Sequence, residues 1–306
     1  MLLWIPTIPA KLYTSGMINQ LSDITIRSAT EKDRQPLANL IHYESRVHRH
    51  LDWRPPLDWI GYHPYFLAEL KRNIVGALAC PPDPPGVAWI RLFAIASQVD
   101  PQQAWNELWL HARRALSSGP AQVKVAVIPL QAWFRDILGQ SGFGFTHEVI
   151  VLSWKGEKLP RLSYTSDVLI RPMKKSDLPA VERIDWSAFA DIWRNSLPCL
   201  ETAFNQSVVA TVAQVSGQVV GYQISTGSTA SGHLARLAIH PSAQGRGIGY
   251  AIVRDLLERF EQRGMFHVTV NTQHNNLASL ALYKKAGFHL TGEVYPVYEH
   301  QIAPAA

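Results

Sequence analysis

The chain repeats itself once, and this repeat limits its possible folds more than any other feature of the sequence. Ile-Thr-Ile-Arg at 24–27 returns as Val-Leu-Ile-Arg at 168–171, which is 144 positions later (171 − 27). Gly-Phe at 142–143 returns at 287–288, which is 145 positions later (287 − 142). The shift of 145 also relates Ile74-Val75-Gly76 to Val219-Val220-Gly221 and Arg91-Leu92 to Arg236-Leu237. A nearly constant shift over most of the chain predicts two tandem domains of one fold.

Length and composition agree with this division. The 306 residues exceed what one small core needs, and 47% hydrophobic with 17% charged residues is typical of a globular chain. We expect one domain at 20–155, a linker at 156–166 where Gly, Lys and Pro interrupt the pattern, and a second domain at 167–306. Residues 1–19 are expected to be an N-terminal arm, unless Met17 is the true start.

Hydrophobic patterning makes each half mixed α/β. In the second half, strands are predicted at 168–171, 207–215, 218–226, 232–240, 266–271 and 288–300. Helices are predicted at about 176–190, 248–263 and 276–286. In the helix at 248–263, Ile252, Leu256 and Phe260 form one apolar stripe together with Val253 and Leu257, which favours a helix that packs on a sheet.

The sequence argues against several classes of protein. It has no apolar run of about 18 residues, so no membrane span is expected, and the start lacks the basic and long apolar regions of a signal peptide. The net charge of +5 includes no run of five Lys or Arg residues, which argues against a nucleic-acid partner. Cys80 and Cys199 are not in a metal-binding spacing, and free thiols fit a cytoplasmic protein.

Three histidines in the first half raise the question of a metal. His42, His48 and His50 have no companion cysteine and no ligand spacing typical of zinc. We therefore expect no metal, and we interpret these histidines as a solvated helical face.

The strongest chemical signal is the glycine-rich bend Gln244–Gly249, which joins a predicted strand to a predicted helix. Glycines at such a bend let backbone amides approach a ligand, and the unpaired amides at a helix start attract phosphate. The bend does not fit G-x-G-x-x-G, and the chain contains no Gly-Lys-Ser/Thr of a P-loop. The pattern that fits is Q-x-x-G-x-G, and an ordinary glycine turn is the alternative.

A second segment points in the same direction. Asn276-Leu277-Ala278-Ser279-Leu280-Ala281-Leu282-Tyr283 precedes Lys284-Lys285-Ala286-Gly287-Phe288. With the glycine bend, it resembles the GCN5-related N-acetyltransferase (GNAT) superfamily, whose members carry N-x-x-A-x-x-L-Y-x-x-x-G-F here. The resemblance implies an α/β (α+β) fold of two tandem GNAT-like domains, each a mixed, mostly antiparallel sheet flanked by helices.

The resemblance also implies acetyl-CoA as cosubstrate and assigns its contacts. Amides of 244–249 would hold the pyrophosphate, and amides of 237–239 would hold the acetyl oxygen. Asn276 would contact the pantetheine arm, and Tyr283 would protonate the leaving thiolate. The predicted cofactor residues are Leu237, Ala238, Ile239, Gln244, Gly245, Arg246, Gly247, Ile248, Gly249, Asn276 and Tyr283. A packed aromatic is the alternative for Tyr283.

The catalytic base and the acceptor site have weaker signals. His233 occupies the place of a glutamate that some members use, so it is the candidate base, with a histidine of no catalytic role as the alternative. His240 and Glu293 are further candidates. Asn271 stands where the members that acetylate ribosomal proteins have a glutamate, and it cannot act as a base. Trp186, Phe189 and Trp193 are the candidate acceptor residues, or else part of a packed core.

The first half lacks this chemistry. At the shift of 145, the two glycines of the pattern at 247 and 249 correspond to Gln102 and Ala104, while Asn276 and Tyr283 correspond to Gln131 and Leu138. We interpret the first half as a degenerate domain that shapes the substrate cleft of the second. Mycothiol synthase is a known tandem member with one degenerate half.

These observations predict an N-acetyltransferase that transfers acetyl from acetyl-CoA to an amine of a small molecule or peptide. Acetylation of a cysteinyl sugar, as in mycothiol synthesis, is a narrower form that only the two-domain layout favours. The alternative from another class is a catalytically silent CoA-binding regulatory or scaffold module. The presence of Tyr283 in the second half favours the enzyme, and the sequence leaves the acceptor and the oligomeric state open.

Overall fold

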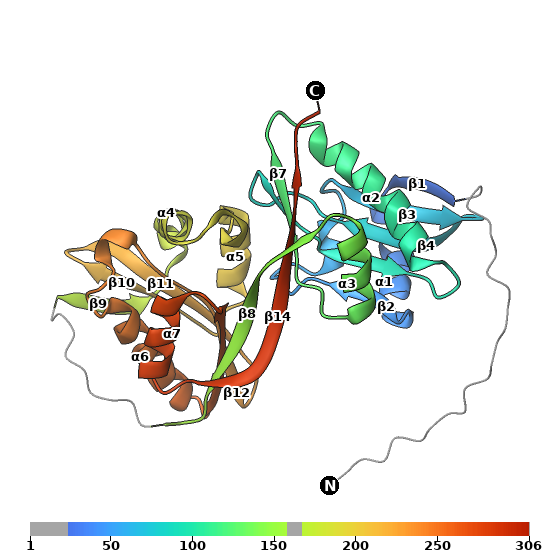
Figure 1. The fold of residues 1–306 in the computed structure, drawn as a ribbon. Helices are drawn as coiled ribbons and strands as arrows, with labels where there is room; N and C mark the ends of the chain where they lie inside the picture. Colours follow the sequence, from blue (N-terminus) through green and yellow to red (C-terminus); the bar gives the residue numbers. More distant parts are fainter. Residues whose placement is uncertain (1–23, 158–166, 306) are drawn as a thin grey trace, which may run out of the picture.

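The computed structural model describes residues 24–157 and 167–305, which form two lobes connected by long shared strands (Figure 1). The expected arm at 1–19 and most of the expected linker at 156–166 lie outside the described residues. No helix in the described part of the chain is long and apolar enough to cross a membrane.

The two halves share most of their order of elements and differ mainly after the first helix, where the first half has a strand and the second half has a further helix. The first half contains β1 (Ile24–Ser28), η2 (Glu31–Asp33), α1 (Arg34–Tyr43), β2 (Arg46–Arg49), η3 (Pro56–Trp59), β3 (Tyr65–Leu70), β4 (Asn73–Ala79), β5 (Val87–Trp89), β6 (Leu92–Ile95), α2 (Pro101–Ser117), β7 (Val123–Val127), α3 (Ala132–Gln140) and β8 (Gly144–Trp154). The second half contains β9 (Val168–Pro172), η4 (Lys175–Asp177), α4 (Leu178–Ala188), η5 (Asp191–Trp193), α5 (Leu197–Asn205), β10 (Val209–Val215), β11 (Gln218–Gly227), β12 (Ser231–Ile239), η6 (Pro241–Ala243), α6 (Ile248–Glu261), β13 (His267–Gln273), α7 (Leu277–Lys285) and β14 (His289–Ile302). The predicted mixed α/β class is confirmed.

The repeat extends to a matched ion pair at the start of each half. Arg27 donates to Asp33 at 2.8 and 2.6 Å, and Arg171 donates to Asp177 at 2.7 and 2.8 Å. In each half the arginine lies in the first strand, and the aspartate ends the 3-10 turn that precedes the first helix. The pair therefore fixes the same strand-to-helix corner twice.

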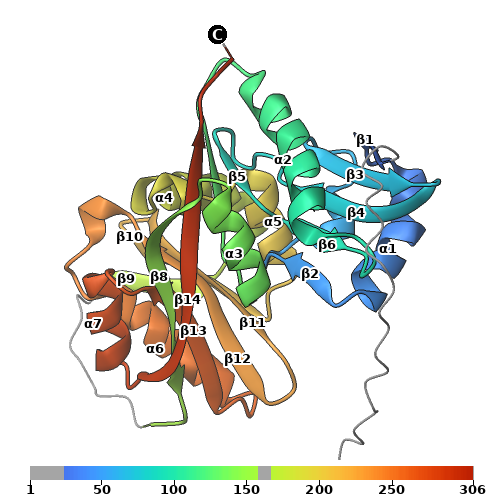
Figure 2. The same cartoon turned by 45° about the vertical axis from the view of Figure 1, so that its right-hand side comes forward.

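Sheet pairing crosses the boundary between the halves. A five-stranded sheet has the order β1-β3-β4-β6-β2, and a nine-stranded sheet has the order β5-β7-β14-β8-β13-β12-β11-β10-β9. Strand β8 of the first half lies between β14 and β13, whereas β14 of the second half pairs with β7. Figure 2 shows β8 and β14 running side by side from one lobe to the other. The halves are therefore continuous in sequence but share strands in space.

Helix α6 shows why the second half folds as predicted. Its apolar stripe of Ile252, Val253, Leu256, Leu257 and Phe260 is fully buried against the sheet. Burial of each such side chain contributes about 1.5–3 kcal/mol to the free energy of unfolding. Just beyond the helix, Gly264 adopts φ +75, a conformation that ends helices and that glycine tolerates best.

Two elements were not predicted. Helix α5 begins where the Ser196 hydroxyl accepts a hydrogen bond from the Cys199 amide, and it buries Leu200 and Ala203. The expectation of a solvated helical face holds for His42, which is exposed on helix α1. It was wrong for the other two histidines: His48 is buried in strand β2, and His50 follows that strand. With only four residues, β2 is too short to show a period by itself.

Candidate active site

A wedge opens between two parallel strands of the second half. Strands β12 and β13 pair only over 231–234 and 267–270, and then they diverge. The His240 amide donates to the Val220 carbonyl of β11 at 2.8 Å, so the His240 amide points toward β11. Because amides alternate sides along an antiparallel ladder, those of Leu237 and Ile239 face away from β11 into the wedge. The Ala238 amide faces β11 instead.

The glycine bend lies at the mouth of this wedge. Gly245 and Gly247 adopt φ +76 and +78, and Gly247 is the N-cap of α6. Residues 244–247 are exposed, and the Gln244 side chain donates to the Ile239 carbonyl at 3.0 Å, which ties the bend to β12. A Cβ atom at Gly245 would meet nothing within 4 Å. The bend thus offers open space above the free amides of a helix start.

The next two residues of the pattern pack α6 into place. Ile248 is buried, and a Cβ atom at Gly249 would lie 3.2 Å from a methyl group of Leu282 on α7. Gly249 therefore permits close packing of α6 on α7. Arg246 is exposed and pairs with Asp167 at 3.2 Å.

Helix α7 contributes Asn276 and Tyr283. The Asn276 side chain caps the helix by accepting from the Ser279 amide at 3.1 Å. Tyr283 is 5% exposed and packs against Phe288 with ring centroids 5.7 Å apart. Burial raises the pKa of Tyr283, so its hydroxyl stays protonated at neutral pH and is available as a proton donor.

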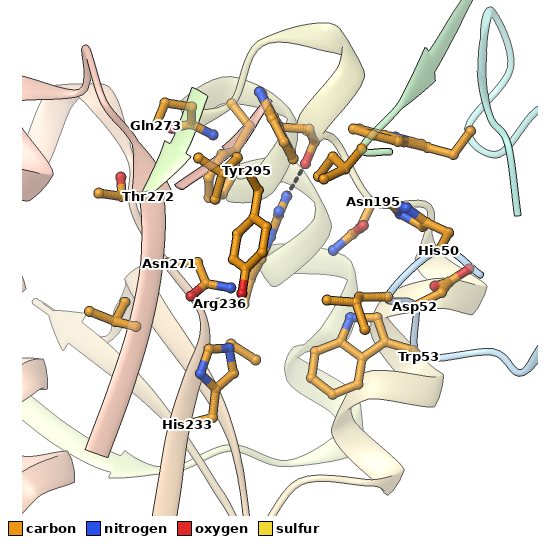
Figure 3. Close-up of a pocket in the computed structure, with 18 of the residues that line it drawn as sticks. His50, Asp52, Trp53, Asn195, His233, Arg236, Asn271, Thr272, Gln273 and Tyr295 are labelled. Atoms are coloured by element: carbon orange, nitrogen blue, oxygen red, sulfur yellow. Dashed lines mark hydrogen bonds between the residues drawn. The ribbon is translucent and has the colours of Figure 1, made fainter. Parts of the chain in front are cut away.

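A cavity of about 590 Å³ joins the wedge to the other half of the molecule. It brings together six of the predicted site residues, namely His233, Leu237, Asn276, Tyr283, Phe189 and Trp193. The first half lines it with His50, Asp52, Trp53, Trp89 and Arg91, among others. Figure 3 shows His50, Asp52 and Trp53 across the cavity from His233, Asn271 and Thr272. The cavity is of a size typical for small-molecule sites.

His233 lies on β12 at the start of the wedge. Its Nδ1 atom is 2.8 Å from the Thr269 hydroxyl on the neighbouring strand. Burial lowers the pKa of His233, so its ring is neutral at pH 7 and can accept a proton. His240 lies elsewhere and caps η6 through the Ser242 amide, at 3.3 Å. Glu293 is exposed and accepts from the Tyr295 hydroxyl at 2.7 Å.

The aromatic residues divide between two places. The Trp193 ring lies 5.2 Å from that of Trp89, and the guanidinium of Arg236 lies 3.7 Å over the Phe189 ring. Both Phe189 and Trp193 line the cavity. Trp186 is 39% exposed and lines a separate, smaller hollow, so the structure does not bring it to the other two.

Sequence reasoning missed a buried charged network in the cavity wall. Asp185 is fully buried and accepts from Arg236 at 2.8 Å and from the Tyr222 hydroxyl at 2.5 Å. Arg236 also donates to the Trp193 carbonyl. Burial opposes the charge of Arg236, but Tyr222 and Asp185 raise its pKa, so it stays a cation. The only sequence signal was the repeat of Arg91 as Arg236.

The same region of the first half is filled by the chain itself. Strand β2 pairs with β6, with Arg49 opposite Leu92 and Val47 opposite Ala94. At the shift of 145, Leu92 and Ala94 correspond to Leu237 and Ile239, whose amides face the open wedge. On its other side, the ring of His48 in β2 lies 4.9 Å from that of Phe134 on α3, the counterpart of α7.

The phosphate position of the first half is also filled. Helix α2 begins at Pro101, and the Asp100 carboxylate accepts from the Gln103 amide at 2.9 Å. Asp100 corresponds to Gly245 at the shift of 145. A carboxylate therefore occupies the helix start of the first half, where the second half presents an exposed glycine.

In the described part of the chain, no group of three or more His, Cys, Asp or Glu side chains is placed to hold a metal ion. His48, one of the three histidines considered for a metal, has its Nε2 atom 3.1 Å from the Ile90 carbonyl. Burial lowers the pKa of His48 to about 4.

Comparison with known proteins finds relatives of the second half. Residues 178–288 match the model of the acetyltransferase (GNAT) family. This segment, within the second half, is a GNAT domain. Over 122 residues it is 27% identical to the ribosomal protein bS18-alanine N-acetyltransferase of Escherichia coli, which covers 39% of this chain and 80% of that enzyme.

Solved structures extend the likeness of fold to both halves of the chain. A tandem GNAT protein from the clavulanic acid biosynthesis pathway has a TM-score of 0.63 at 12% identity, covering 92% of this chain and 100% of that chain. A GCN5-related N-acetyltransferase from Sphaerobacter thermophilus has a TM-score of 0.59 at 16% identity, covering 93% and 97%. The predicted arrangement of two tandem domains is thereby confirmed.

Proposed function

We propose that this GNAT protein is an N-acetyltransferase that transfers acetyl from acetyl-CoA to an amine of a small molecule or peptide, and that only its second half binds acetyl-CoA. The single observation that carries the proposal is the wedge, which the outward amides of Leu237 and Ile239 face. The Gln244 side chain ties the glycine bend to this strand, and Leu237 lines the cavity. Family membership supports acetyl transfer in general.

The residues present fit acetyl-CoA. The exposed bend at 244–247, open above Gly245, matches the need of a pyrophosphate for backbone amides without a side chain in the way. Asn276 and Tyr283 line the cavity into which the pantetheine arm would run. When bound, acetyl-CoA supplies an acetyl group activated as a thioester.

The chain's own residues account for the charges and protons of transfer. The amides of Leu237 and Ile239 would stabilise negative charge on the acetyl oxygen. The amine nitrogen bonds to the acetyl carbon as the bond from carbon to sulfur breaks, and Tyr283 donates its proton to the sulfur. The neutral ring of His233 takes the proton that the amine loses, directly or through water.

The neutral form of the amine is the one that attacks, and this sets what the base must do. A lysine side chain has a pKa near 10.4, whereas an α-amine has one of about 7.7–8.0. A base with a pKa lowered by burial, such as His233, suits an amine of low pKa better than a lysine.

The alternative is a CoA-binding regulatory or scaffold module that performs no transfer. It would use the bend but would need neither Tyr283 nor a base. The presence of Tyr283, His233 and a cavity of about 590 Å³ in one continuous space favours the enzyme.

The test combines binding and turnover. Calorimetry with acetyl-CoA is expected to show one site per chain, and a panel of amines, aminoglycosides, polyamines and peptide N-termini is expected to yield free thiol from at least one acceptor. Binding without thiol release from any amine would favour the silent module.

A further inference from the structure

Strand β2 does more than fill the first half's wedge, because the chain that leaves it enters the cavity of the second half. The His50 amide donates to the Arg91 carbonyl at 3.0 Å, which extends the pairing of β2 and β6 by one residue. The next residues, Leu51, Asp52 and Trp53, line the cavity together with His50. We call residues 50–53 the cavity segment.

The cavity segment is fixed to its own half by a buried ion pair. Arg91 donates to the Asp52 carboxylate at 2.8 Å, and the two side chains are 8% and 7% exposed. The Arg91 guanidinium also lies 4.6 Å over the Trp59 ring. The His50 ring stacks on Trp89 with centroids 4.6 Å apart and an interplanar angle of 22°.

The same segment is fixed to the other half at its far end. The Gln206 side chain at the end of α5 donates to the Trp53 carbonyl at 2.9 Å. The Trp53 ring packs against the core under α4 and β11, which includes Leu178 and Tyr222. The segment is therefore held from both lobes, and its side chains form the wall opposite β12 and β13 (Figure 3).

Some polar side chains of the cavity wall already have an ion-pair partner within the protein, and others are neutral. The charged residues of the lining are four arginines and two aspartates, namely Arg49, Arg91, Arg194, Arg236, Asp52 and Asp83. Asp52 is paired with Arg91, and Arg236 is paired with Asp185. Burial lowers the pKa of His50 well below its usual value, so its ring is neutral. The neutral polar side chains that line the cavity include those of His50, Asn195, Asn271, Thr272 and Gln273, and the aromatic ones include Trp53, Trp89, Phe189, Trp193 and Tyr295.

This lining has consequences for the acceptor. A polyamine or a basic peptide requires several unpaired carboxylates to replace the water that it loses. The lining offers two carboxylates against four arginines, and one of the two, that of Asp52, is committed to Arg91. Neutral amides, an imidazole and aromatic faces instead match an acceptor with hydroxyl groups and few charges. The wall fits a hydroxylated amine better than a polycation.

We infer that the cavity segment 50–53, carried into place by β2, selects the acceptor of the second half and that His50 contacts a hydroxylated amine there. This inference rests on the proposed function. It assigns the degenerate half a direct part in acceptor recognition, with the segment supplying one wall and β12 with β13 supplying the other.

The test compares acceptors in the full chain. Glucosamine and galactosamine represent hydroxylated amines, and spermidine and a lysine peptide represent polycations. Thiol release is expected to give kcat/KM for at least one hydroxylated amine at least tenfold above both polycations. Preference for spermidine or the lysine peptide would overturn the inference. Absence of turnover with every amine, alongside normal acetyl-CoA binding, would instead overturn the proposed function.

Variants of His50 test whether this side chain contacts the amine. His50→Ala is expected to raise KM for the preferred amine about tenfold, the size of one lost hydrogen bond, with KM for acetyl-CoA unchanged. Affinity for the amine, followed through the fluorescence of the cavity tryptophans without acetyl-CoA, is expected to fall by the same factor. His50→Gln is expected to recover part of the loss, and His42→Ala, on an exposed side chain outside the cavity, is the matched control. An unchanged amine affinity in a folded His50→Ala protein would contradict the role.

Discussion

The two halves of the chain share one fold, and they differ in what lies beside two corresponding strands, β12 in the second half and β6 in the first. In the second half, the outward amides of Leu237 and Ile239 face an open wedge, and Gly245 leaves the helix start exposed. In the first half, β2 pairs with the corresponding strand, and the Asp100 carboxylate caps the corresponding helix. One fold thus becomes a site or a scaffold according to whether its own chain fills the wedge.

We therefore propose two physical causes for the absence of acetyl-CoA binding in the first half. Replacement of glycine by Gln102 adds a side chain, as the sequence indicated. In addition, β2 occupies the wedge and forms hydrogen bonds with the edge of β6, so the amides of this edge are not available to a ligand. This second cause is visible only in the structure. The filled wedge also holds the cavity segment in the second half's cavity.

The largest expected effect comes from making the second half resemble the first. Gly247→Gln is expected to reduce acetyl-CoA affinity by more than 10²-fold, because a residue with a Cβ atom is strained at φ +78 and its side chain obstructs the bend. Calorimetry measures the affinity. Gln102→Gly in the first half is the matched control and should bind like the unaltered protein. If Gly247→Gln retained its affinity for acetyl-CoA, the glutamine at position 102 could not explain why the first half does not bind the cofactor.

The second expected effect concerns the proton donor. Tyr283→Phe removes the hydroxyl without changing the ring, so turnover is expected to fall roughly 10²-fold or more while acetyl-CoA affinity stays the same. Tyr298→Phe, on β14 and away from the lining of the cavity, serves as control. Normal turnover in Tyr283→Phe would leave Tyr283 as a packed aromatic.

Replacement of His233 is expected to have a smaller effect on kcat/KM and to change its dependence on pH. His233→Ala copies Ala88 of the first half, and it is expected to lower kcat/KM about tenfold, since water in the cavity takes over part of the role. In the unaltered protein the lowered pKa keeps the ring neutral at pH 6.5 and above, so activity should decline only below the usual value near 6.5. A decline that persists in His233→Ala would assign it to another group.

The stability of β2 in its wedge is expected to depend on pH through His48. Its pKa is about 4 in the folded chain and near 6.5 when unfolded, so the unfolded chain binds more protons between these values. Stability is therefore full above pH 6.5 and falls as the pH drops toward 4, by on the order of 3 kcal/mol. Denaturant unfolding of His48→Gln should show a shallower pH dependence than the unaltered protein, and an equal slope would contradict this origin.

The smallest expected effect comes from restoring glycines in the first half. Asp100→Gly with Gln102→Gly copies the bend of the second half but leaves β2 in the wedge, so acetyl-CoA stoichiometry should remain one per chain. Loss of the Asp100 cap is expected to lower the free energy of unfolding by only a few tenths of a kcal/mol. A second binding site in this variant would show that the bend alone, and not β2, closes the first half.

Much of the fold was predictable because the sequence repeats and its periods are strong. The strands at 218–226 and 232–240 and the helix at 248–263 were predicted within a few residues of β11, β12 and α6. Strand β2 and the exchange of β8 with β14 were not, because a strand's partner is chosen by packing between distant segments. No local pattern at 46–49 reveals that it pairs with 92–95.

The candidate site divides in the same way. The bend and Tyr283 belong to local motifs that a single sequence displays, and their positions relative to the cavity follow from the fold. The network of Asp185, Tyr222 and Arg236 joins residues up to 51 positions apart, so its parts have no common signal in the sequence. The contribution of His50 and Trp53 to the cavity depends on β2 and was equally hidden.

A crystal structure of the full chain with CoA tests the central claim most directly. The account predicts one nucleotide per chain, with its pyrophosphate on the amides of 244–249, its pantetheine arm between β12 and β13, and β2 still paired with β6. A nucleotide bound along β6, with β2 displaced, would contradict it.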